Sequence, residues 1–474
     1  MKIKSGIKDV MWSYLGTSLR FGSSLLVLPF ILKTIPSDQL GIWYIFQTLN
    51  ALVALLDFGF SGTIIRNVAY SWAGVKDLSH SGFSKGRNKK SNINLLWQII
   101  SVSRRVYLVI SITALLFSSS LGTIYLINIS SGISLSYILT AWGIFLLGLF
   151  FNLYYSYWNA ILTGLGLVKQ FQQANVFSGL TYLIVALAGL KQGLGIISLS
   201  LAFFFSGMII RILCRNFFSA FAKKQNFRYD GYKHIPFSKK VFSTLWFNAK
   251  KNGITALGSY LVLQFNAFFI PVFIDLKASA MYGLMIQITR LVSQFGNVPM
   301  VASYGELNCL RAENKIDVLR SKISAFYTIG LGVLVFSAFG IFFCGNFFLD
   351  LIKSKTMLPS GGLLILFLLI MIMEWSTTYF TVIISTENKI PFVKASIISG
   401  IAIITCGYIL MRFFSMGLWA IVLSQILVQI CYNYWRWNYW VIKDLGLSFL
   451  GFYELGISNL RLVFLKQIKK RLKL

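Results

Sequence analysis

The amino-acid sequence predicts an all-α integral membrane protein with about twelve transmembrane helices in two pseudo-symmetric six-helix lobes. Of its 474 residues, 56% are hydrophobic and only 12% are charged, whereas a soluble domain carries roughly 25% charged residues. Mainly apolar segments that are long enough to cross ~30 Å of hydrocarbon recur along the whole chain. They are expected near residues 10–32, 40–62, 105–126, 135–163, 171–190, 194–220, 244–274, 279–303, 323–345, 359–385, 393–411 and 416–440.

The distribution of Lys and Arg predicts the orientation of these helices, because basic loops remain on the cytoplasmic side of a membrane. With the N-terminus in the cytoplasm, 36 of the 44 basic residues fall in inner loops or near the chain ends, and only six fall in outer loops. Both termini are therefore expected to be cytoplasmic. Basic loops beside an anionic leaflet also account for the formal net charge of +30, so nucleic acid is not an expected partner.

An internal repeat divides the predicted helices into two halves. Six spans is an even number, so both halves enter the membrane from the same side and the repeat is parallel. We expect an N-lobe at 1–222, a cytoplasmic inter-lobe linker at 223–243, a C-lobe at 244–440 and a basic amphipathic tail at 441–474. The tail is either a helix on the inner leaflet or a solvated basic segment. Identical residues recur at an offset of 242, including Gly16/Gly258, Pro29/Pro271 and Gly41/Gly283.

Four of the predicted helices carry polar residues at helical spacing, which places these residues on one face of each helix. Polar side chains are costly in lipid, so such faces must contact protein or water. Stripes from symmetry-related helices can satisfy one another by converging on a central aqueous cavity. The residues expected to line it are Ser13, Thr17 and Ser24 on the first helix, Gln47 and Asn50 on the second, Thr255, Ser259 and Asn266 on the seventh, and Gln287, Gln294 and Asn297 on the eighth.

Two arginines, Arg20 and Arg290, belong to these stripes. Arg20 lies ten residues into its span from the inner side and Arg290 lies eleven residues into its span from the outer side, so both are expected roughly 15 Å deep, near the midplane. A guanidinium group presents paired donors that fit phosphate oxygens. The pair therefore favours an anionic ligand such as a diphosphate. In the alternative interpretation Arg20 pairs with Asp57, Arg290 binds backbone carbonyls, and both only hold the lobes together.

Two acids lie within predicted spans, Asp57 in the second and Glu374 in the tenth. Either could carry a coupling proton or a sodium ion. Alternatively, Asp57 forms a salt bridge with Arg66 or caps a bend at Gly59. The five cysteines are far apart in sequence and have no C-x-x-C spacing and no nearby histidine, so neither a disulfide framework nor a metal site is expected.

The segment LGIWYIFQTLNALVALLDFGFSGTIIRNVAY, from Leu40 to Tyr70, resembles the second helix and following loop of Wzx-type O-antigen flippases. These proteins belong to the MOP (multidrug/oligosaccharidyl-lipid/polysaccharide) exporter superfamily. The aspartate–glycine pair, Asp57 and Gly59, and the later Arg66 carry the resemblance. The stretch KDVMWSYLGTSLRFGSSLLVLPFIL is similar to the first helix of that family. The resemblance implies a MATE/MOP-like fold, with six-plus-six helices around a central cavity.

The resemblance also implies a function. Related flippases receive the diphosphate of a polyprenyl-linked sugar on cationic cavity residues, a role that falls here to Arg20 and Arg290. Position 262, the symmetry mate of Arg20, is Val262 and carries no charge, so a third cavity arginine is absent. The expected protein is a flippase, not an enzyme, without a cofactor, in the bacterial inner membrane. It would move an undecaprenyl-diphosphate-linked oligosaccharide from the cytoplasmic to the periplasmic leaflet by alternating access.

Two other functions are weighed against the flippase. A multidrug exporter of the same superfamily would favour acidic cavity residues, which bind cationic drugs. Asp57 and Glu374 are acids within predicted spans, so this alternative stays open. A membrane-embedded polysaccharide polymerase or ligase is less favoured, because the outer loops are too short to fold into a catalytic surface. The expected partners are the lipid-linked glycan and membrane lipids. For a flippase, a polysaccharide polymerase and a chain-length regulator are candidate protein partners.

Overall fold

The chain folds into two compact units in a computed structural model that describes residues 26–79, 82–83, 91–130, 132–228, 230–312, 315–359, 361–385 and 391–459. Unit 1 contains the described residues up to Tyr260, together with Ile352–Lys355. Unit 2 contains Leu261–Leu351 and the described residues from Thr356 onward. The chain passes from one unit to the other inside a helix, at Tyr260 and Leu261, whereas the sequence predicts a linker at 223–243. The four predicted domain ranges stay a prediction.

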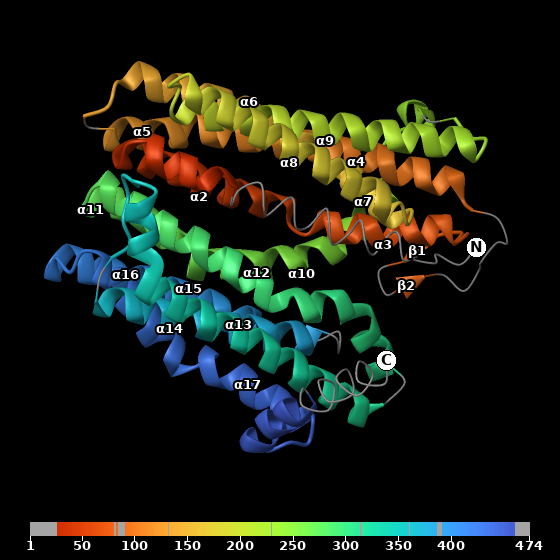
Figure 1. The fold of residues 1–474 in the computed structure, drawn as a ribbon. Helices are drawn as coiled ribbons and strands as arrows, with labels where there is room; N and C mark the ends of the chain where they lie inside the picture. The colour runs from red at the N-terminus through yellow and green to blue at the C-terminus, as the bar shows by residue number, and fades with distance from the viewer. Residues whose placement is uncertain are drawn as a thin grey trace, which may run out of the picture. The chain divides into compact units, whose positions relative to one another are not determined.

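Unit 1 is built from helices and one small hairpin (Figure 1). Its first described helix covers residues 26–34. The elements that follow are α2 (Ser37–Ala54), η1 (Leu55–Asp57), α3 (Phe60–Trp72), β1 (Leu78–Ser79), β2 (Gly82–Phe83), α4 (Ile93–Phe117), the π-helical turn η2 (Ser118–Gly122), α5 (Thr123–Ile129), α6 (Leu135–Tyr154), α7 (Tyr157–Gly164), α8 (Val168–Lys191), α9 (Ile196–Lys224), η3 (Gly231–His234) and α10 (Lys239–Leu263).

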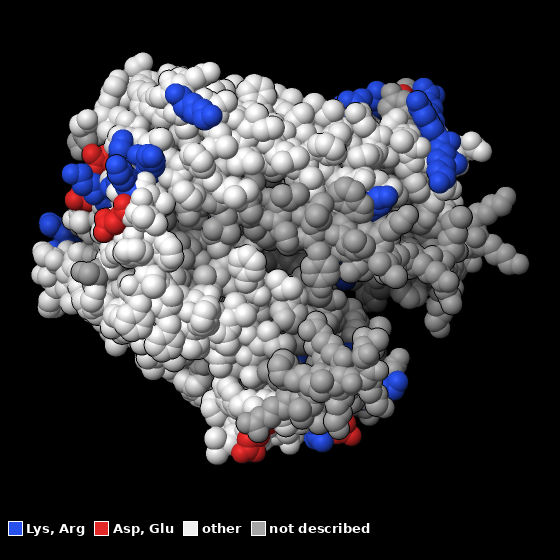
Figure 2. Space-filling model, viewed as in Figure 1, with Lys and Arg blue, Asp and Glu red and all other residues white. Residues whose placement is uncertain are grey.

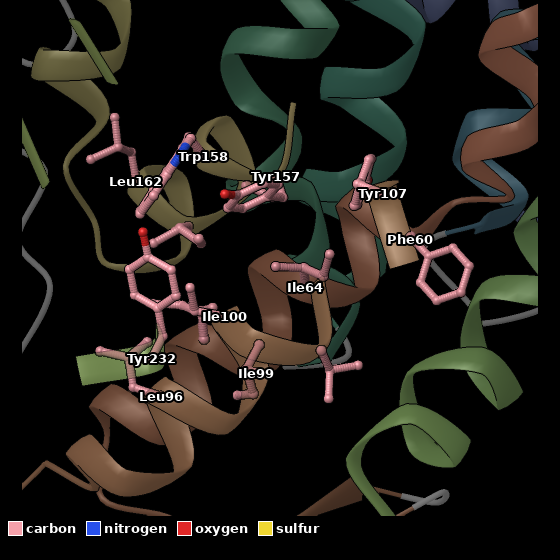
Figure 3. Packing of buried hydrophobic residues seen from close by; sticks show 14 of the residues in the cluster. Phe60, Ile64, Leu96, Ile99, Ile100, Tyr107, Tyr157, Trp158, Leu162 and Tyr232 are labelled. Carbon is pink, nitrogen blue, oxygen red and sulfur yellow. The ribbon is translucent and has the colours of Figure 1, made fainter. Parts of the chain in front are cut away.

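Long helices pack along one another in unit 1, with α9 between α6 and α8 (Figure 1). One buried core of unit 1 includes Ile64 on α3, Tyr107 on α4 and Trp158 on α7. Figure 3 shows these aromatic and aliphatic side chains meeting between the helices, while the ring of Phe60 is directed toward α10. That ring lies 5.8 Å from Trp246 of α10, measured between centroids. The start of α3 is thereby joined to α10 by aromatic packing.

Unit 2 is helical throughout its described part. Its core is an aromatic cluster in which Tyr327 packs against Trp375, Tyr379 and Phe380. The elements are the end of α10, then η4 (Phe265–Phe268), α11 (Ile270–Phe273), α12 (Leu276–Ala312), α13 (Ile316–Leu351), α14 (Gly362–Ser385), α15 (Val393–Phe414), α16 (Leu418–Cys431), α17 (Asn433–Asp444) and a final helix at 449–459.

The final helix belongs to the segment that the sequence sets apart as a basic tail. Its residue Phe452 is fully buried and its ring lies 5.5 Å from that of Tyr327. Phe449 and Leu450 on the same helix are exposed, at 58% and 73%. The helix therefore packs on unit 2 with one face and presents an apolar face outward. Residues 460–474, with the basic end of the predicted tail, lie outside the described residues.

Nine helices of the described chain are long and apolar enough to cross a membrane. A tenth candidate is a broken pair, Ala256–Leu263 and Phe265–Phe273, which bends by 46°. Each predicted span from the second to the twelfth coincides with helical structure, although α12, which carries Arg290, is not among the ten. In Figure 2 the surface over α4, α6 and α9 is almost free of charge, and Lys and Arg gather near helix ends. The prediction of an all-helical membrane protein is confirmed, and the β1–β2 pair is the only strand structure among the described residues.

Candidate functional site

The predicted site residues of the first helix, Ser13, Thr17, Arg20 and Ser24, lie outside the described residues. Thr255 falls in α10, but its side chain also lies outside the described part of the structure. Of the two arginines that the sequence predicts in the site, only Arg290 is among the described residues. The remaining predicted residues lie on α2, η1, α3 and α10 in unit 1 and on η4, α12 and α14 in unit 2.

Arg290 is the fifteenth residue of α12 and its side chain is exposed. Neither a hydrogen bond nor an ion pair joins it to any other described residue. Gln294 and Asn297 follow on the same helix face and are half-buried. Their oxygens, Oε1 of Gln294 and Oδ1 of Asn297, are buried and have no hydrogen-bond partner among the described residues. Because an unsatisfied buried polar atom costs about 1–3 kcal/mol, this face of α12 is suited to accept hydrogen bonds from water or a ligand.

Asn266 lies in η4, where the α10 helix breaks. It is 3% exposed, and its Oδ1 atom has no partner among the described residues. The preceding residue Gln264 has φ −126° and ψ −34°, outside the helical range. Pro271 then occupies the start of α11, where its missing N–H is tolerated. The break thus leaves a buried amide at a helix junction of unit 2.

The other predicted polar residues differ in exposure. Gln47 and Asn50 on α2 are half-buried, and so is Gln287 on α12. Ser259 on α10 is exposed. Val262, which the predicted repeat pairs with Arg20, is buried at 6% exposure. That these residues line one central cavity stays a prediction.

Asp57 ends η1 and its carboxylate joins two neighbouring helices. The hydroxyl of Tyr107 on α4 donates a hydrogen bond to Oδ1, and the backbone N–H of Ser61 donates to Oδ2 at 3.3 Å. The Ser61 and Tyr107 hydroxyls are also 3.2 Å apart. This geometry matches the interpretation that Asp57 caps the bend at Gly59. No ion pair joins Asp57 to Arg66, which is exposed on α3.

Glu374, in the middle of α14, accepts three hydrogen bonds on a single oxygen. The donors to Oε1 are Nε2 of Gln425 at 3.0 Å, Nε2 of Gln429 at 2.9 Å and the hydroxyl of Tyr434 at 3.1 Å. The two glutamines lie one turn apart on α16, and Tyr434 lies on α17. All three donors are less than 9% exposed. An acid within a membrane span is thus held by neutral groups from two other helices.

The polar network around Glu374 continues away from the carboxylate. Oε1 of Gln429 accepts from Nδ2 of Asn433 at 2.6 Å, and the same Nδ2 donates to Oγ of Ser399 at 2.8 Å. Oδ1 of Asn433 accepts from Nε1 of Trp437 at 3.0 Å. These partners of Glu374 are absent from the site that the sequence predicts. The four-residue spacing of Gln425, Gln429 and Asn433 in an apolar span is the signal that could have revealed them.

The sequence matches no family model and no curated protein, but solved structures resemble the fold. A multidrug resistance MATE family transporter of the MOP superfamily in an inward-facing conformation aligns with a TM-score of 0.64 and 14% identity, over 90% of this chain and 95% of that chain. An outward-facing MATE family transporter of the same superfamily aligns with a TM-score of 0.55 and 13% identity, over 93% and 96% of the two chains. The chain has the MATE fold. The fold prediction is confirmed.

A third similar structure is a MOP superfamily transporter from Pyrococcus furiosus, for which a reversed polarity of the binding pocket is described as suggesting a different function. It aligns with a TM-score of 0.52 and 15% identity, over 94% of this chain and 98% of that chain. Identities this low show a shared fold. A fold hosts more than one substrate class, so the substrate has to be argued from the residues of this chain.

Proposed function

We propose that the chain is a flippase of the Wzx type in a bacterial inner membrane. Its substrate is an undecaprenyl-diphosphate-linked oligosaccharide, such as an O-antigen repeat unit, which it moves from the cytoplasmic to the periplasmic leaflet. The observation that carries the proposal is Arg290, an exposed guanidinium in the middle of α12 without a carboxylate partner among the described residues.

Arg290 lies near the centre of the span that the sequence predicts at 279–303. An arginine at the centre of a membrane helix costs about 2.5–3.5 kcal/mol even on insertion scales. A chain that keeps such a residue, and does not neutralise it with a described acid, requires another anion or water at that position. A diphosphate offers oxygens that bind a guanidinium through two parallel hydrogen bonds. Gln294 and Asn297, on the same face of α12, supply amide groups with unsatisfied buried oxygens. These oxygens can accept hydrogen bonds from the hydroxyls of a sugar.

The second candidate is a multidrug exporter, which is favoured by the MATE transporters that share the fold. Such a protein would use free acids to bind cationic drugs. Both membrane acids of this chain are engaged within their own helix bundles: Asp57 binds Tyr107 and Ser61, and Glu374 binds Gln425, Gln429 and Tyr434. Of Asp57, Glu374 and Arg290, the residue without a partner among the described residues is Arg290, whose charge is positive. This supports an anionic substrate over a cationic one.

Alternating access fits the proposed reaction, because the diphosphate and sugar need a polar route while the polyprenyl chain remains in lipid. Structures of the same fold are described in inward-facing and outward-facing conformations. We assign the coupling of transport to an ion to Glu374, since a carboxylate surrounded by neutral donors can exchange a proton or a sodium ion. Asp57 has the contacts of a helix cap, so it is the weaker candidate for coupling.

The proposal is tested by expressing the chain in a strain that lacks its own O-antigen flippase. The return of surface polysaccharide is the expected result. In parallel, purified protein in vesicles should make a polyprenyl-diphosphate-linked glycan accessible to a glycan-modifying enzyme on the opposite side. If instead the chain raises drug resistance in an exporter-deficient strain and moves no lipid-linked glycan, the multidrug exporter is the better function.

A further inference from the structure

Unit 1 contains a cavity of about 410 Å³, and none of the predicted site residues that the structure describes lines it. It lies between α4, the start of α3 and the start of α10, and its walls include Phe60, Val109, Phe242 and Trp246. Its volume is within the roughly 300–1,000 Å³ typical of ligand pockets. The lining is almost wholly apolar, and its charged member is Arg105.

Arg105 gives this apolar cavity a positive rim. Its guanidinium carbon lies 5.8 Å from the centroid of the Phe237 ring, which also lines the cavity. The Arg105 side chain is exposed, and no ion pair links it to a carboxylate of the described chain. Asp57 lies in sequence between the lining residues Leu56 and Phe58 but does not itself line the cavity. Its carboxylate is bonded to Tyr107 and Ser61. An occupant that combines a hydrocarbon chain with an anionic head would complement both parts of the cavity.

The position of Arg105 along α4 places it at the edge of the hydrocarbon. The span Ile93–Ile129 has 37 residues and is ~55 Å long, which exceeds the ~30 Å hydrocarbon thickness. Exposed apolar residues begin one turn after Arg105 and continue to the end of the span: Leu108, Val109, Ile112, Leu116, Leu121 and Ile124. The helix therefore enters the hydrocarbon just beyond Arg105, and the guanidinium lies at the level of the lipid headgroups.

The cavity is open to the lipid on this same face of α4. Val109 is 64% exposed and also lines the cavity, and Thr113 lines it one turn further on. Trp246 on the opposite wall is 41% exposed. A lipid of the surrounding leaflet can therefore enter sideways with its chain parallel to α4. Phospholipids are far more abundant in a bilayer than any lipid-linked sugar, so mass action favours them as the occupant.

We propose that this cavity binds one acyl chain of an anionic phospholipid of the inner leaflet, with Arg105 receiving its phosphate. The lipid fills the space between α4, α3 and α10 and neutralises a guanidinium that the described chain leaves unpaired. It thereby supports the junction between η1 and α3. This site is separate from the face of α12 that carries Arg290, and the proposal does not depend on the transported substrate.

The test uses lipids whose acyl chains carry bromine, which quenches tryptophan fluorescence on contact. The full-length protein is reconstituted into phosphatidylcholine vesicles that contain the same mole fraction of either brominated phosphatidylglycerol or brominated phosphatidylcholine. The emission of Trp246 is obtained by subtracting the Trp246→Phe variant. We expect the brominated anionic lipid to quench Trp246 at about one-fifth of the concentration needed for the zwitterionic lipid. This ratio is the gain in affinity that one basic side chain gives toward an anionic lipid surface.

Three variants test whether the preference for the anionic lipid arises at this cavity. Arg105→Gln should make the two brominated lipids equal, whereas Arg436→Gln should retain the preference, because Arg436 also lies over an aromatic ring, 5.3 Å from Trp440, but is not part of the cavity. Thr113→Phe, at an exposed wall position, should reduce quenching by the anionic lipid even if Arg105→Gln does not fold. Equal quenching by both lipids in the unmodified protein would overturn the proposal. Displacement of the brominated lipid by a few molecules of polyprenyl phosphate would overturn it in favour of a substrate tail.

Discussion

The hydroxyl of Tyr107 donates a hydrogen bond to the carboxylate of Asp57, and this contact joins α4 to the bend between α2 and α3. The two residues that follow Asp57, Phe58 and Gly59, both have left-handed backbone conformations, with φ of 45° and 75°. Such a conformation is unfavourable for a phenylalanine. The bend is therefore stabilised from outside, by Tyr107 on one carboxylate oxygen and by the Ser61 N–H on the other.

Removing the Tyr107 hydroxyl should destabilise unit 1 more than removing a tyrosine hydroxyl that makes no hydrogen bond destabilises the protein. Tyr107→Phe loses a hydrogen bond to a carboxylate and leaves Asp57 short of a donor, so we expect the free energy of unfolding to fall by about 1–3 kcal/mol. Thermal unfolding of the purified protein in detergent measures the change. Tyr408→Phe is the control, because the Tyr408 hydroxyl is exposed and makes no hydrogen bond within the described chain. Equal stability of the two variants would contradict a supporting role for Tyr107.

Two glycines of α13 offer a matched test of close packing in unit 2. A Cβ atom at Gly330 would lie 2.3 Å from Cζ2 of the buried Trp375 and 2.7 Å from the carbonyl oxygen of Gly296, whereas a Cβ atom at Gly332 would meet nothing within 4 Å. Gly330→Ala should therefore lower the unfolding free energy by about 1–3 kcal/mol. Gly332→Ala should raise it by up to ~1 kcal/mol, since alanine favours a helix. A denaturation series on both variants decides whether α12, α13 and α14 depend on this contact.

The membrane helices could be predicted from sequence because apolar segments of sufficient length have few alternatives in lipid. Segments near 323–345 and 359–385 correspond to α13 and α14. The sequence predicts a single span near 244–274, whereas the structure has α10, η4 and α11 there, with a 46° bend. Pro271 corresponds to Pro29 in the predicted repeat. The helix breaks before this proline, at Gln264. No residue type there signals a break.

The partners of the charged residues could not be predicted in the same way. Glu374 was recognised as a membrane acid, but its donors come from α16 and α17, some 50 to 60 residues later. The sequence of a helix that is apolar on most sides does not show which face contacts a neighbouring helix. The contacts between α14 and α16 therefore depend on how their side chains pack, which the sequence alone does not show. For the same reason Tyr107 was not expected to reach Asp57.

Arg290 provides the most direct test of the anionic substrate. Arg290→Ala should abolish surface polysaccharide in the flippase-deficient strain while the amount of protein in the membrane remains near normal. Arg290→Lys should restore the polysaccharide only in part, because an ammonium group lacks the paired donors of a guanidinium. Arg20→Ala is expected to behave like Arg290→Ala. Arg412→Ala, at an exposed position near the end of α15, is the control and should be active. Full activity of Arg290→Ala would remove the phosphate role, and loss of the folded protein would indicate a structural one.

Glu374 can be tested separately from substrate binding. Glu374→Gln keeps an oxygen that accepts from Gln425, Gln429 and Tyr434, so the variant should fold normally. It cannot take up or release a proton and binds a cation poorly, so transport in vesicles should no longer respond to an imposed proton or sodium gradient. Asp57→Asn is the comparison, and it should remain responsive if Asp57 is a cap. A Glu374→Gln protein that is still driven by a gradient would place coupling elsewhere.

The last prediction concerns access of water to α12. The buried oxygen of Gln294 lacks a partner among the described residues, which is costly unless water or substrate reaches it in some state. After replacement of the five native cysteines, Gln294→Cys should therefore react with membrane-impermeant thiol reagents. Phe336→Cys should not react, since Phe336 is 82% exposed in the middle of the apolar span α13 and faces lipid. Adding a polyprenyl-diphosphate-linked glycan should change the rate at Gln294→Cys, because a ligand shifts a conformational equilibrium by binding one state better. If both cysteines stayed unlabelled with and without glycan, the polar face of α12 would be a dry helix contact, and Arg290 would stabilise the fold without touching a substrate.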